Sequence, residues 1–252
     1  MFASLLRTLD GIDGLERIRF TSLHPKDFKA DTVAAMAECD NVCEHIHLPV
    51  QAGSDAVLKR MKRAYTRTKY LEKIEMVRTA IPDVAVTTDI IVGFPGETEE
   101  EFDETLSLVA TARYDAAYTF QYSSRPMTEA ADLSGHLPKD VVQERYDRLT
   151  SLQTDISFDQ NRKLVGTSQQ VLVEGTSKKD PGKLTGRTRT NKLVHFDDTG
   201  AATGTFVIIS VTDAHPHFLE GHPEGAIQAD TRPTSGLLLP MATAATECNS
   251  CA

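Results

Sequence analysis

Two strand-to-helix turns carry the residues best suited to hold a ligand. One carries Gln51 and Ser54, and the other carries Asp89 and the glycine-rich residues 93–96. An amide, a hydroxyl and a carboxylate thus stand beside glycines that let the backbone approach a flat or anionic ligand closely. In a parallel α/β architecture such turns meet at the carboxyl ends of the strands, where ligands bind. The alternative is that both are ordinary turns, in which Ser54 and Thr98 only cap the helices that follow.

Four cysteines are present, but none of their spacings completes a metal site. Cys39 and Cys43 are separated by three residues, and the third ligand of a Cys-x3-Cys-x2-Cys cluster motif would fall on Ile46. Cys248 and Cys251 form a Cys-x2-Cys half-site that lacks a second pair. We therefore assign no metal ligand and no catalytic residue to the chain.

Cys43, His45 and His47 alternate along a predicted strand and therefore share one face of it. Side chains on one face of a strand stand about 7 Å apart, which is too wide for a single tetrahedral ion. The pattern favours a polar layer inside a barrel over a metal centre.

The composition is that of a folded protein with one large domain, or with a large domain and a small one. The 252 residues are 40% hydrophobic and 25% charged. They contain no run of eighteen apolar residues, which excludes a membrane span, and the opening segment lacks the basic stretch of a signal peptide. We expect a cytoplasmic protein with reduced cysteines and no membrane partner.

The first two thirds of the chain alternate β-rich runs with amphipathic helical stretches, which is typical of a parallel α/β sheet. Thr98 and Glu101 form a capping box ahead of an apolar stripe that includes Phe102 and Val109, so a helix is expected there. Two further helices are expected between residues 54 and 81. Four strands are predicted, at residues 16–22, 44–50, 84–92 and 116–123.

The last third of the chain has a different residue pattern. Strand-like runs at residues 170–174, 192–196 and 204–212 are separated by Gly, Lys and Asp turns, which predicts a small all-β barrel. A long polar helix precedes it, and no strand follows that helix, so we interpret it as a connector. The expected organisation is an α/β part, a linker helix, a barrel and a disordered tail, at residues 1–137, 138–165, 166–222 and 223–252.

Positive charge is concentrated in the predicted barrel. The chain has a formal net charge of -9, yet residues 162–195 carry eight Lys or Arg against two acidic residues. This stretch is therefore +6 and the rest of the chain is -15. Because each cation that neutralises a phosphate releases a condensed counterion, the stretch favours a polyanion such as RNA over a merely solvated surface.

Several long strings resemble one known family. HIHLPVQAGSDAVLKRMKRAYT, TTDIIVGFPGETEEEF and FQYSSRP are similar to the radical S-adenosylmethionine (radical SAM) methylthiotransferases, especially the MiaB-like tRNA enzymes. VLVEGTSKKDPGKLTGRTRTNKLVHF resembles the RNA-binding TRAM domain that ends those proteins. The resemblance runs to about Gly221. It implies an α/β fold, a partial radical-SAM (β/α) barrel (strands 3 to 6) followed by a small all-β TRAM barrel.

The resemblance also implies a chemistry. The family uses S-adenosylmethionine and two [4Fe-4S] clusters to place a methylthio group on N6-isopentenyladenosine beside the anticodon, so the expected partner is tRNA through its anticodon stem-loop. By position, the cofactor-binding residues would be Gln51, Ser54, Asp89, Val92, Gly93, Phe94 and Gly96. The RNA-binding residues would be the cations of the barrel, namely Lys178, Lys179, Lys183, Arg187, Arg189 and Lys192.

The chain departs from the family pattern in its cysteines. Members carry three cluster cysteines in an amino-terminal domain and a Cys-x3-Cys-x2-Cys motif after the first barrel strand, and neither set is in this sequence. We expect a transferase by family whose chain is inactive alone. A natural truncation, a gene-boundary error and a split protein whose amino-terminal half supplies the cysteines are the three explanations that stay open. Two alternatives stay open: a non-catalytic TRAM-type RNA-binding protein, and a sister methylthiotransferase acting on threonylcarbamoyl-adenosine or on a ribosomal protein.

Overall fold

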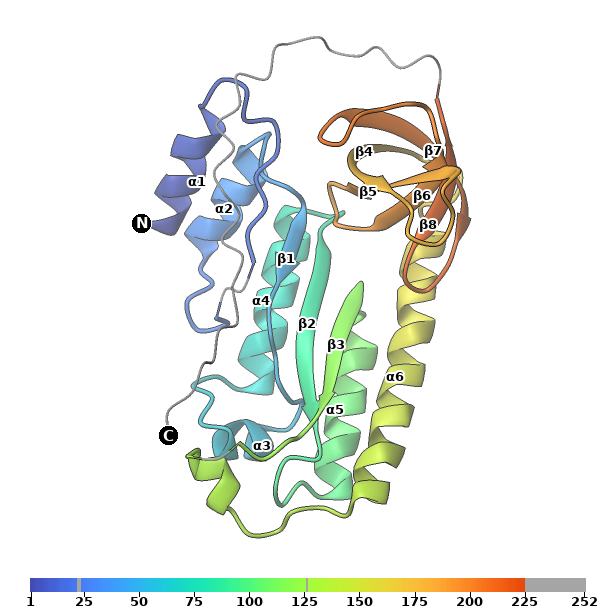
Figure 1. The fold of residues 1–252 in the computed structure, drawn as a ribbon. Helices are drawn as coiled ribbons and strands as arrows, with labels where there is room; N and C mark the ends of the chain where they lie inside the picture. The colour runs from blue at the N-terminus through green and yellow to red at the C-terminus, as the bar shows by residue number, and fades with distance from the viewer. Residues whose placement is uncertain (22–23, 126, 225–252) are drawn as a thin grey trace, which may run out of the picture.

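Two structural units follow one another along the chain, an open sheet covered by helices and a closed β-barrel (Figure 1). The computed structural model describes residues 1–21, 24–125 and 127–224. The predicted tail therefore lies almost wholly outside the described residues, and its cysteines lie there too. Its predicted start is corrected by one residue, because Pro223 is the last residue of a barrel strand.

The first unit is built on a three-stranded parallel sheet in the order β1-β2-β3. His47 of β1 pairs with Thr87 of β2, and Asp89 of β2 pairs with Tyr118 of β3, so these four side chains share one face. The elements in chain order are α1 (Phe2–Asp10), α2 (Ala30–Glu38), β1 (His45–His47), α3 (Asp55–Arg60), α4 (Arg67–Ala80), β2 (Ala85–Val92), α5 (Glu99–Ala112), β3 (Ala116–Gln121), the 3-10 helix η1 (Glu129–Asp132) and α6 (Lys139–Arg162).

Three of the four predicted strands are confirmed, and the first is corrected. Residues 16–22 were expected to form a strand, but the described part of this run makes one parallel bridge, between Ile18 and Val42. The flanking residues Arg17 and Arg19 donate instead to carbonyl oxygens of the barrel unit. The predicted strand is therefore reduced to a single bridge, and the arginines on either side of it contact the barrel unit.

The two faces of the sheet have different surroundings. Val86, Ile90 and Val92 of β2 are buried in one apolar core with the residues of α4, α5 and α6, and Figure 1 shows these helices along one side of the strands. Tyr118 and Phe120 of β3 are exposed on the other side. We call this second side, the side of His47, Asp89 and Tyr118, the open face.

The helix predicted after residue 138 is confirmed as α6, but it is more than a connector. Leu149 is fully buried and Ile156 nearly so, both within the core of the first unit. Gln153 and Ser157 donate to the backbone oxygens of Tyr114 and Asp115, just ahead of β3. The helix therefore completes the covered side of the sheet before it reaches the barrel.

The capping box predicted for α5 is confirmed. Thr98 accepts from the backbone N–H of Glu101, and the Glu101 carboxylate accepts in return from the backbone N–H of Thr98. Phe102 and Val109 are fully buried, as the helical spacing predicts.

The second unit is a closed five-stranded barrel in the order β4-β5-β6-β8-β7. The sequence did not predict two of its strands, β5 and β8, because each contains a glycine in its interior, a residue that disfavours strands. Those glycines allow close strand contact: a Cβ on Gly186 or Gly221 would stand 2.3 Å from a backbone oxygen of the neighbouring strand. The barrel strands are β4 (Ser168–Thr176), β5 (Lys183–Thr188), β6 (Leu193–Asp197), β7 (Phe206–Ala214) and β8 (Leu219–Pro223).

None of the helices within residues 1–21, 24–125 and 127–224 has the length and apolar character that a membrane crossing requires.

The packing of α6 predicts that its buried face stabilises the first unit. Leu149→Ala should lower the free energy of unfolding by about 2–5 kcal/mol, because it leaves a cavity in the core. Ser151→Ala, on the exposed side of the same helix, is the control and should change it by less than about 0.5 kcal/mol. Urea unfolding of the two variants measures the difference, and equal values would show that α6 is only a connector.

Candidate functional site

The carboxyl ends of β1 and β2 bring Gln51 and Asp89 together. The backbone N–H of Gln51 donates to the backbone oxygen of Asp89 at 2.9 Å, and the backbone oxygen of Gln51 accepts from the N–H of Ile91 at 2.9 Å. Gln51 adopts a φ of 72°, which lets the chain bend from β1 toward α3 while it keeps these two bonds. The Asp89 carboxylate is on the open face, 3.4 Å from Nε2 of His47.

The glycine-rich turn after β2 is largely enclosed by protein. Gly93 has a φ of 78°, and a Cβ there would stand 2.6 Å from the side chain of Val142. Its N–H donates to the Glu97 carboxylate at 3.4 Å, and the N–H of Gly96 donates to the oxygen of Gly135 at 2.8 Å. These two N–H groups therefore have partners within the protein, so the turn shapes the end of the sheet rather than presenting them to a ligand.

Val92 and Phe94 of the same turn are buried, while Gly96 is exposed. The Phe94 ring packs against Tyr122 with 5.2 Å between ring centres. Behind the turn, the buried Glu97 carboxylate accepts from Nη1 of Arg145 at 2.9 Å. The cofactor role predicted for Val92, Gly93, Phe94 and Gly96 stays a prediction.

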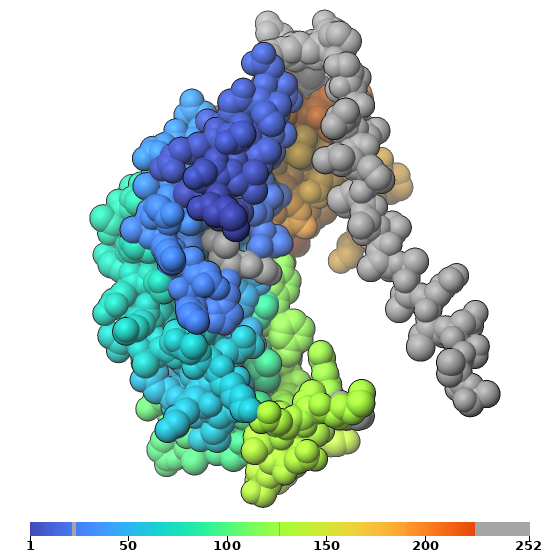
Figure 2. All heavy atoms as spheres, turned by 90° about the vertical axis from the view of Figure 1, so that its left-hand side faces the viewer, coloured from blue at the N-terminus to red at the C-terminus, as the bar shows by residue number. Residues whose placement is uncertain are grey.

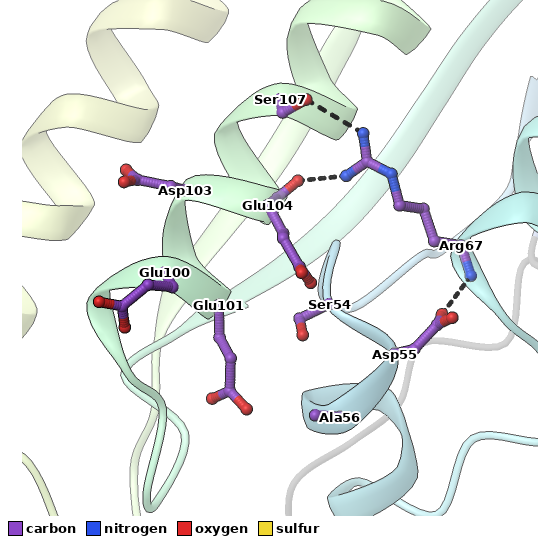
Figure 3. A pocket seen from close by; sticks show the side chains of 9 residues that line it. All are labelled: Ser54, Asp55, Ala56, Arg67, Glu100, Glu101, Asp103, Glu104 and Ser107. Atoms are coloured by element: carbon purple, nitrogen blue, oxygen red, sulfur yellow. Dashed lines mark hydrogen bonds between the residues drawn. The ribbon is translucent and has the colours of Figure 1, made fainter.

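Ser54 lies in a different setting from Asp89. It is buried at the start of α3, where Gly53 comes so close to α5 that a Cβ would stand 2.4 Å from the Cα of Thr105. Ser54 lines a groove between α3 and α5 (Figure 3). The other lining residues are mostly acidic. The guanidinium of Arg67 already donates hydrogen bonds to the backbone oxygen of Glu104 and, at 3.1 Å, to the hydroxyl of Ser107. Such a groove disfavours an anionic ligand.

The open face carries a row of polar groups next to exposed aromatic rings. Oγ1 of Thr87 lies 2.9 Å from Nδ1 of His47 and 3.2 Å from Nε2 of His45. The His47 ring meets Tyr118 edge to face with 5.9 Å between ring centres. The side chains of Tyr118 and Phe120 are 57% and 53% exposed. Imidazole and carboxylate groups that form hydrogen bonds, with rings that can stack, suit a flat heteroaromatic ligand.

Tyr118 and Phe120 were not among the sequence-predicted site residues. The signal that could have found them is the alternation within residues 116–121, which places both rings on one face of the strand with Ala116. Their exposure depends on which face the helices cover, and the sequence pattern does not state it.

His45 is buried among groups that keep it neutral. Burial lowers its pKa to about 4, and the nearby positive charges of Arg19 and His47 act in the same direction. Its Nδ1 has no hydrogen-bond partner in the described structure.

The described residues do not fit an iron-sulfur cluster. Cys39 and Cys43 are both buried, and burial raises the pKa of each thiol. Within residues 1–21, 24–125 and 127–224, no three His, Cys, Asp or Glu side chains are grouped as metal ligands would be. A cluster needs converging thiolates, so no step through a cluster can be derived from these residues.

The six cations predicted to bind RNA divide by their surroundings. Lys178 and Lys179 are exposed on the turn between β4 and β5. Lys183 pairs with Glu220 at 3.2 Å, and Arg187 pairs with Glu174 at 3.4 Å. Arg189 and Lys192 pair with acidic residues of the first unit, Glu44 and Asp115, each at 2.6 Å. The structure therefore brings together two of the six as an exposed pair, and the RNA-binding role of all six stays a prediction.

The sequence also did not predict a cluster of aromatic rings near Lys179 and Lys183. His215 and Phe218 stack with 4.2 Å between ring centres, and His195 meets Phe218 edge to face at 5.1 Å. The pKa of His195 is lowered, first by burial and then by the nearby Lys183 and Lys179. The three rings come from β6 and from the loop before β8, so they are separated in sequence.

Comparisons with known proteins match both units. The Radical SAM superfamily model matches residues 2–109, and the TRAM domain model matches residues 162–223. The chain is 53% identical over 225 residues to a tRNA-2-methylthio-N(6)-dimethylallyladenosine synthase of Nocardia farcinica, covering 86% of this chain and 45% of the relative. It is 52% identical over 239 residues to the protein of that name in Saccharopolyspora erythraea, covering 92% and 49%. The chain thus spans about half the length of the curated relatives that it matches.

Among solved structures, coproporphyrinogen III oxidase (HemN) from Escherichia coli aligns with 66% of this chain and 45% of its own, with a TM-score of 0.46 and 16% identity.

The buried state of His45 predicts a pH-dependent stability. An unfolded histidine has its ordinary pKa of about 6.5, so the folded chain binds this proton less tightly than the unfolded chain does. The contribution of neutral His45 to the free energy of unfolding is present above about pH 6.5 and is lost as the pH falls toward 4. His45→Gln should therefore lose less stability than the wild type between pH 7 and pH 4, by roughly 3 kcal/mol at most. Urea unfolding at several pH values measures this, and parallel curves would contradict it.

Proposed function

This chain belongs to the MiaB-like radical SAM methylthiotransferases, and we propose that it supplies the RNA-binding barrel and part of the S-adenosylmethionine site of an enzyme that methylthiolates tRNA. The observation that carries the proposal is the closed TRAM-type barrel fixed to a radical SAM sheet, together with relatives of that activity at about 52% identity. The proposed substrate is N6-isopentenyladenosine in the anticodon stem-loop, and the proposed location is the cytoplasm, where tRNA is modified.

The open face supports the cofactor part of the proposal. S-adenosylmethionine, when bound, supplies the methyl group of the transfer. Asp89, next to Gln51 at the carboxyl ends of the strands, has a partly exposed carboxylate that can accept hydrogen bonds from ribose hydroxyls or an amino group. His47 holds that carboxylate in place, and the buried turn after β2 fixes the backbone behind it. Ser54 lines a separate acidic groove, so the proposal depends on Gln51 and Asp89 more than on Ser54.

The same chain does not hold the clusters in its described residues, so we propose that it binds but does not by itself carry out the reaction. In the proposed enzyme the cluster thiolates come from a segment that corresponds to the other half of the relatives. A non-catalytic RNA-binding role is the second candidate, because the described residues lack a metal group while the TRAM-type barrel is complete. Binding of S-adenosylmethionine to the isolated chain, measured by isothermal titration calorimetry, separates the two, since only the first candidate includes part of a cofactor site.

The exposed lysine pair supports the RNA part and predicts a salt-dependent affinity. Lys178→Ala/Lys179→Ala should weaken tRNA binding about tenfold at low salt and reduce the slope of log affinity against log salt by about 1.5, because two phosphate contacts are lost. Filter binding of tRNA across a salt series measures both quantities.

The control removes the same charge elsewhere. Lys69→Ala/Lys139→Ala changes two exposed lysines on α4 and α6 and should leave the affinity and the slope within about twofold of the wild type. No tRNA binding at low salt, or equal losses in the two double variants, would contradict the RNA-binding proposal.

A further inference from the structure

The turn between β5 and β6 reaches into the amino-terminal end of the parallel sheet. Nε of Arg189 lies 2.8 Å from Oε2 of Glu44, and one of its terminal nitrogens lies 2.6 Å from Oε1. The same nitrogen donates to the backbone oxygens of Asp40 and Val42 at 2.9 and 2.8 Å. Four acceptors of the first unit thus surround one guanidinium of the barrel, just ahead of β1.

Lys192, at the other side of the same turn, makes a second ion pair ahead of β3. Its Nζ lies 2.6 Å from Oδ1 of Asp115, and the two side chains are only 10% and 14% exposed. The other carboxylate oxygen of Asp115 accepts from the backbone N–H of Val86 at 2.8 Å. Asp115 is therefore held by the sheet, and Lys192 is held by Asp115.

Two arginines of the first unit reach in the opposite direction. Arg17 donates to the oxygens of Arg187 and Gln170 at 2.8 and 3.2 Å, and Arg19 donates to the oxygen of Thr188 at 2.9 Å. The Arg17 guanidinium also lies 4.8 Å from the centre of the Phe206 ring. Charged side chains from both units thus cross the same contact, which we call the seam.

We propose that Arg189 and Lys192 are positioning residues that lock the RNA-binding barrel onto the amino-terminal end of the sheet, and that RNA phosphates are left to Lys178 and Lys179. The proposal rests on the proposed function for its RNA part. To bind a phosphate, Arg189 or Lys192 would have to abandon a carboxylate at 2.6 Å in a partly buried place, whereas Lys178 and Lys179 are exposed.

The lock has a consequence for substrate geometry. The strands run away from the seam, and Asp89 lies three residues beyond Val86, the β2 residue whose N–H donates to Asp115. At 3.3 Å per residue, these two positions are roughly 10 Å apart along the strand. Figure 2 shows the surface hollowed between the orange barrel and the yellow-green segment that follows β3. An RNA held by the barrel must cover this distance to place a base at the site.

The seam also contains a cysteine, Cys43, whose alkylation can report whether the barrel is docked. The thiol of Cys43 is buried, which raises its pKa, while Arg19, Arg17 and Arg189 act in the opposite direction and therefore lie close to it. Glu44 beside it reflects the ion pair. Burial, the largest effect, raises the pKa of this carboxyl, but the hydrogen bonds and charge of Arg189, with a backbone hydrogen bond and the charge of Arg17, together lower it. If the barrel undocks, Cys43 becomes accessible and its alkylation accelerates.

The test is a charge swap, read by the alkylation of Cys43 and by tRNA binding. The parent chain carries Cys39→Ser, Cys248→Ser and Cys251→Ser, so that N-ethylmaleimide reports Cys43 alone. Arg189→Glu should accelerate alkylation about tenfold or more, and adding Glu44→Arg should reverse part of that acceleration, because it remakes the ion pair but not the hydrogen bonds to the backbone oxygens of Asp40 and Val42. Lys178→Ala/Lys179→Ala is the matched control and should leave alkylation unchanged while it weakens tRNA binding.

The charge swap should bind tRNA within about threefold of the parent chain, because both charges are still present and Lys178 and Lys179 are unchanged. Arg189→Gln, which only removes the charge, replaces Arg189→Glu if circular dichroism shows that the reversal prevents folding. Unchanged Cys43 protection in both Arg189 variants would overturn the lock. So would a docked swap that binds tRNA about tenfold more weakly, because Arg189 would then be an RNA ligand. If the parent chain binds no tRNA, the proposed function fails, and the alkylation rates still decide whether the lock exists.

Discussion

The two unlike ends of a parallel sheet determine how this protein is arranged. Because all three strands run the same way, their carboxyl ends collect Gln51, Asp89 and the turn after β2, while their amino ends collect the acidic groups Glu44 and Asp115. The first set suits a ligand, and the second set receives the cations of the barrel. One strand direction thus separates the proposed chemistry from the docking of the barrel.

The sequence identified most of the elements, for reasons that are local. The α5 capping box and its apolar stripe depend on residues within two turns of each other, and both are confirmed. The predicted first strand is only a single bridge at Ile18, and its neighbours Arg17 and Arg19 find partners about 170 residues away, which no window of neighbouring residues can show. Strands β5 and β8 were missed because their glycines are explained only by the neighbouring strand that they allow to approach.

The candidate sites could be predicted only in part. Motif strings pointed to Gln51 and Asp89, and the structure brings them together. The sequence could not show that the Gly93 and Gly96 N–H groups are used internally, or that Ser54 faces an acidic groove. A count of charges treats all six barrel cations alike. Their ion pairs distinguish them, since Arg189 and Lys192 contact a unit that is distant in sequence and Lys178 and Lys179 lie on an exposed turn.

In the proposed arrangement, RNA contacts the exposed turn of the barrel and the open face of the sheet, while contacts between the two units of the protein fill the seam. Ultraviolet cross-linking of tRNA to the chain, with the attached peptides mapped by mass spectrometry, distinguishes these surfaces. We expect cross-links in the peptides that contain Lys178 and Lys179 and in the β3 peptide that contains Tyr118 and Phe120. Cross-links concentrated on residues 188–192, with none at the lysine turn or β3, would contradict the proposed arrangement.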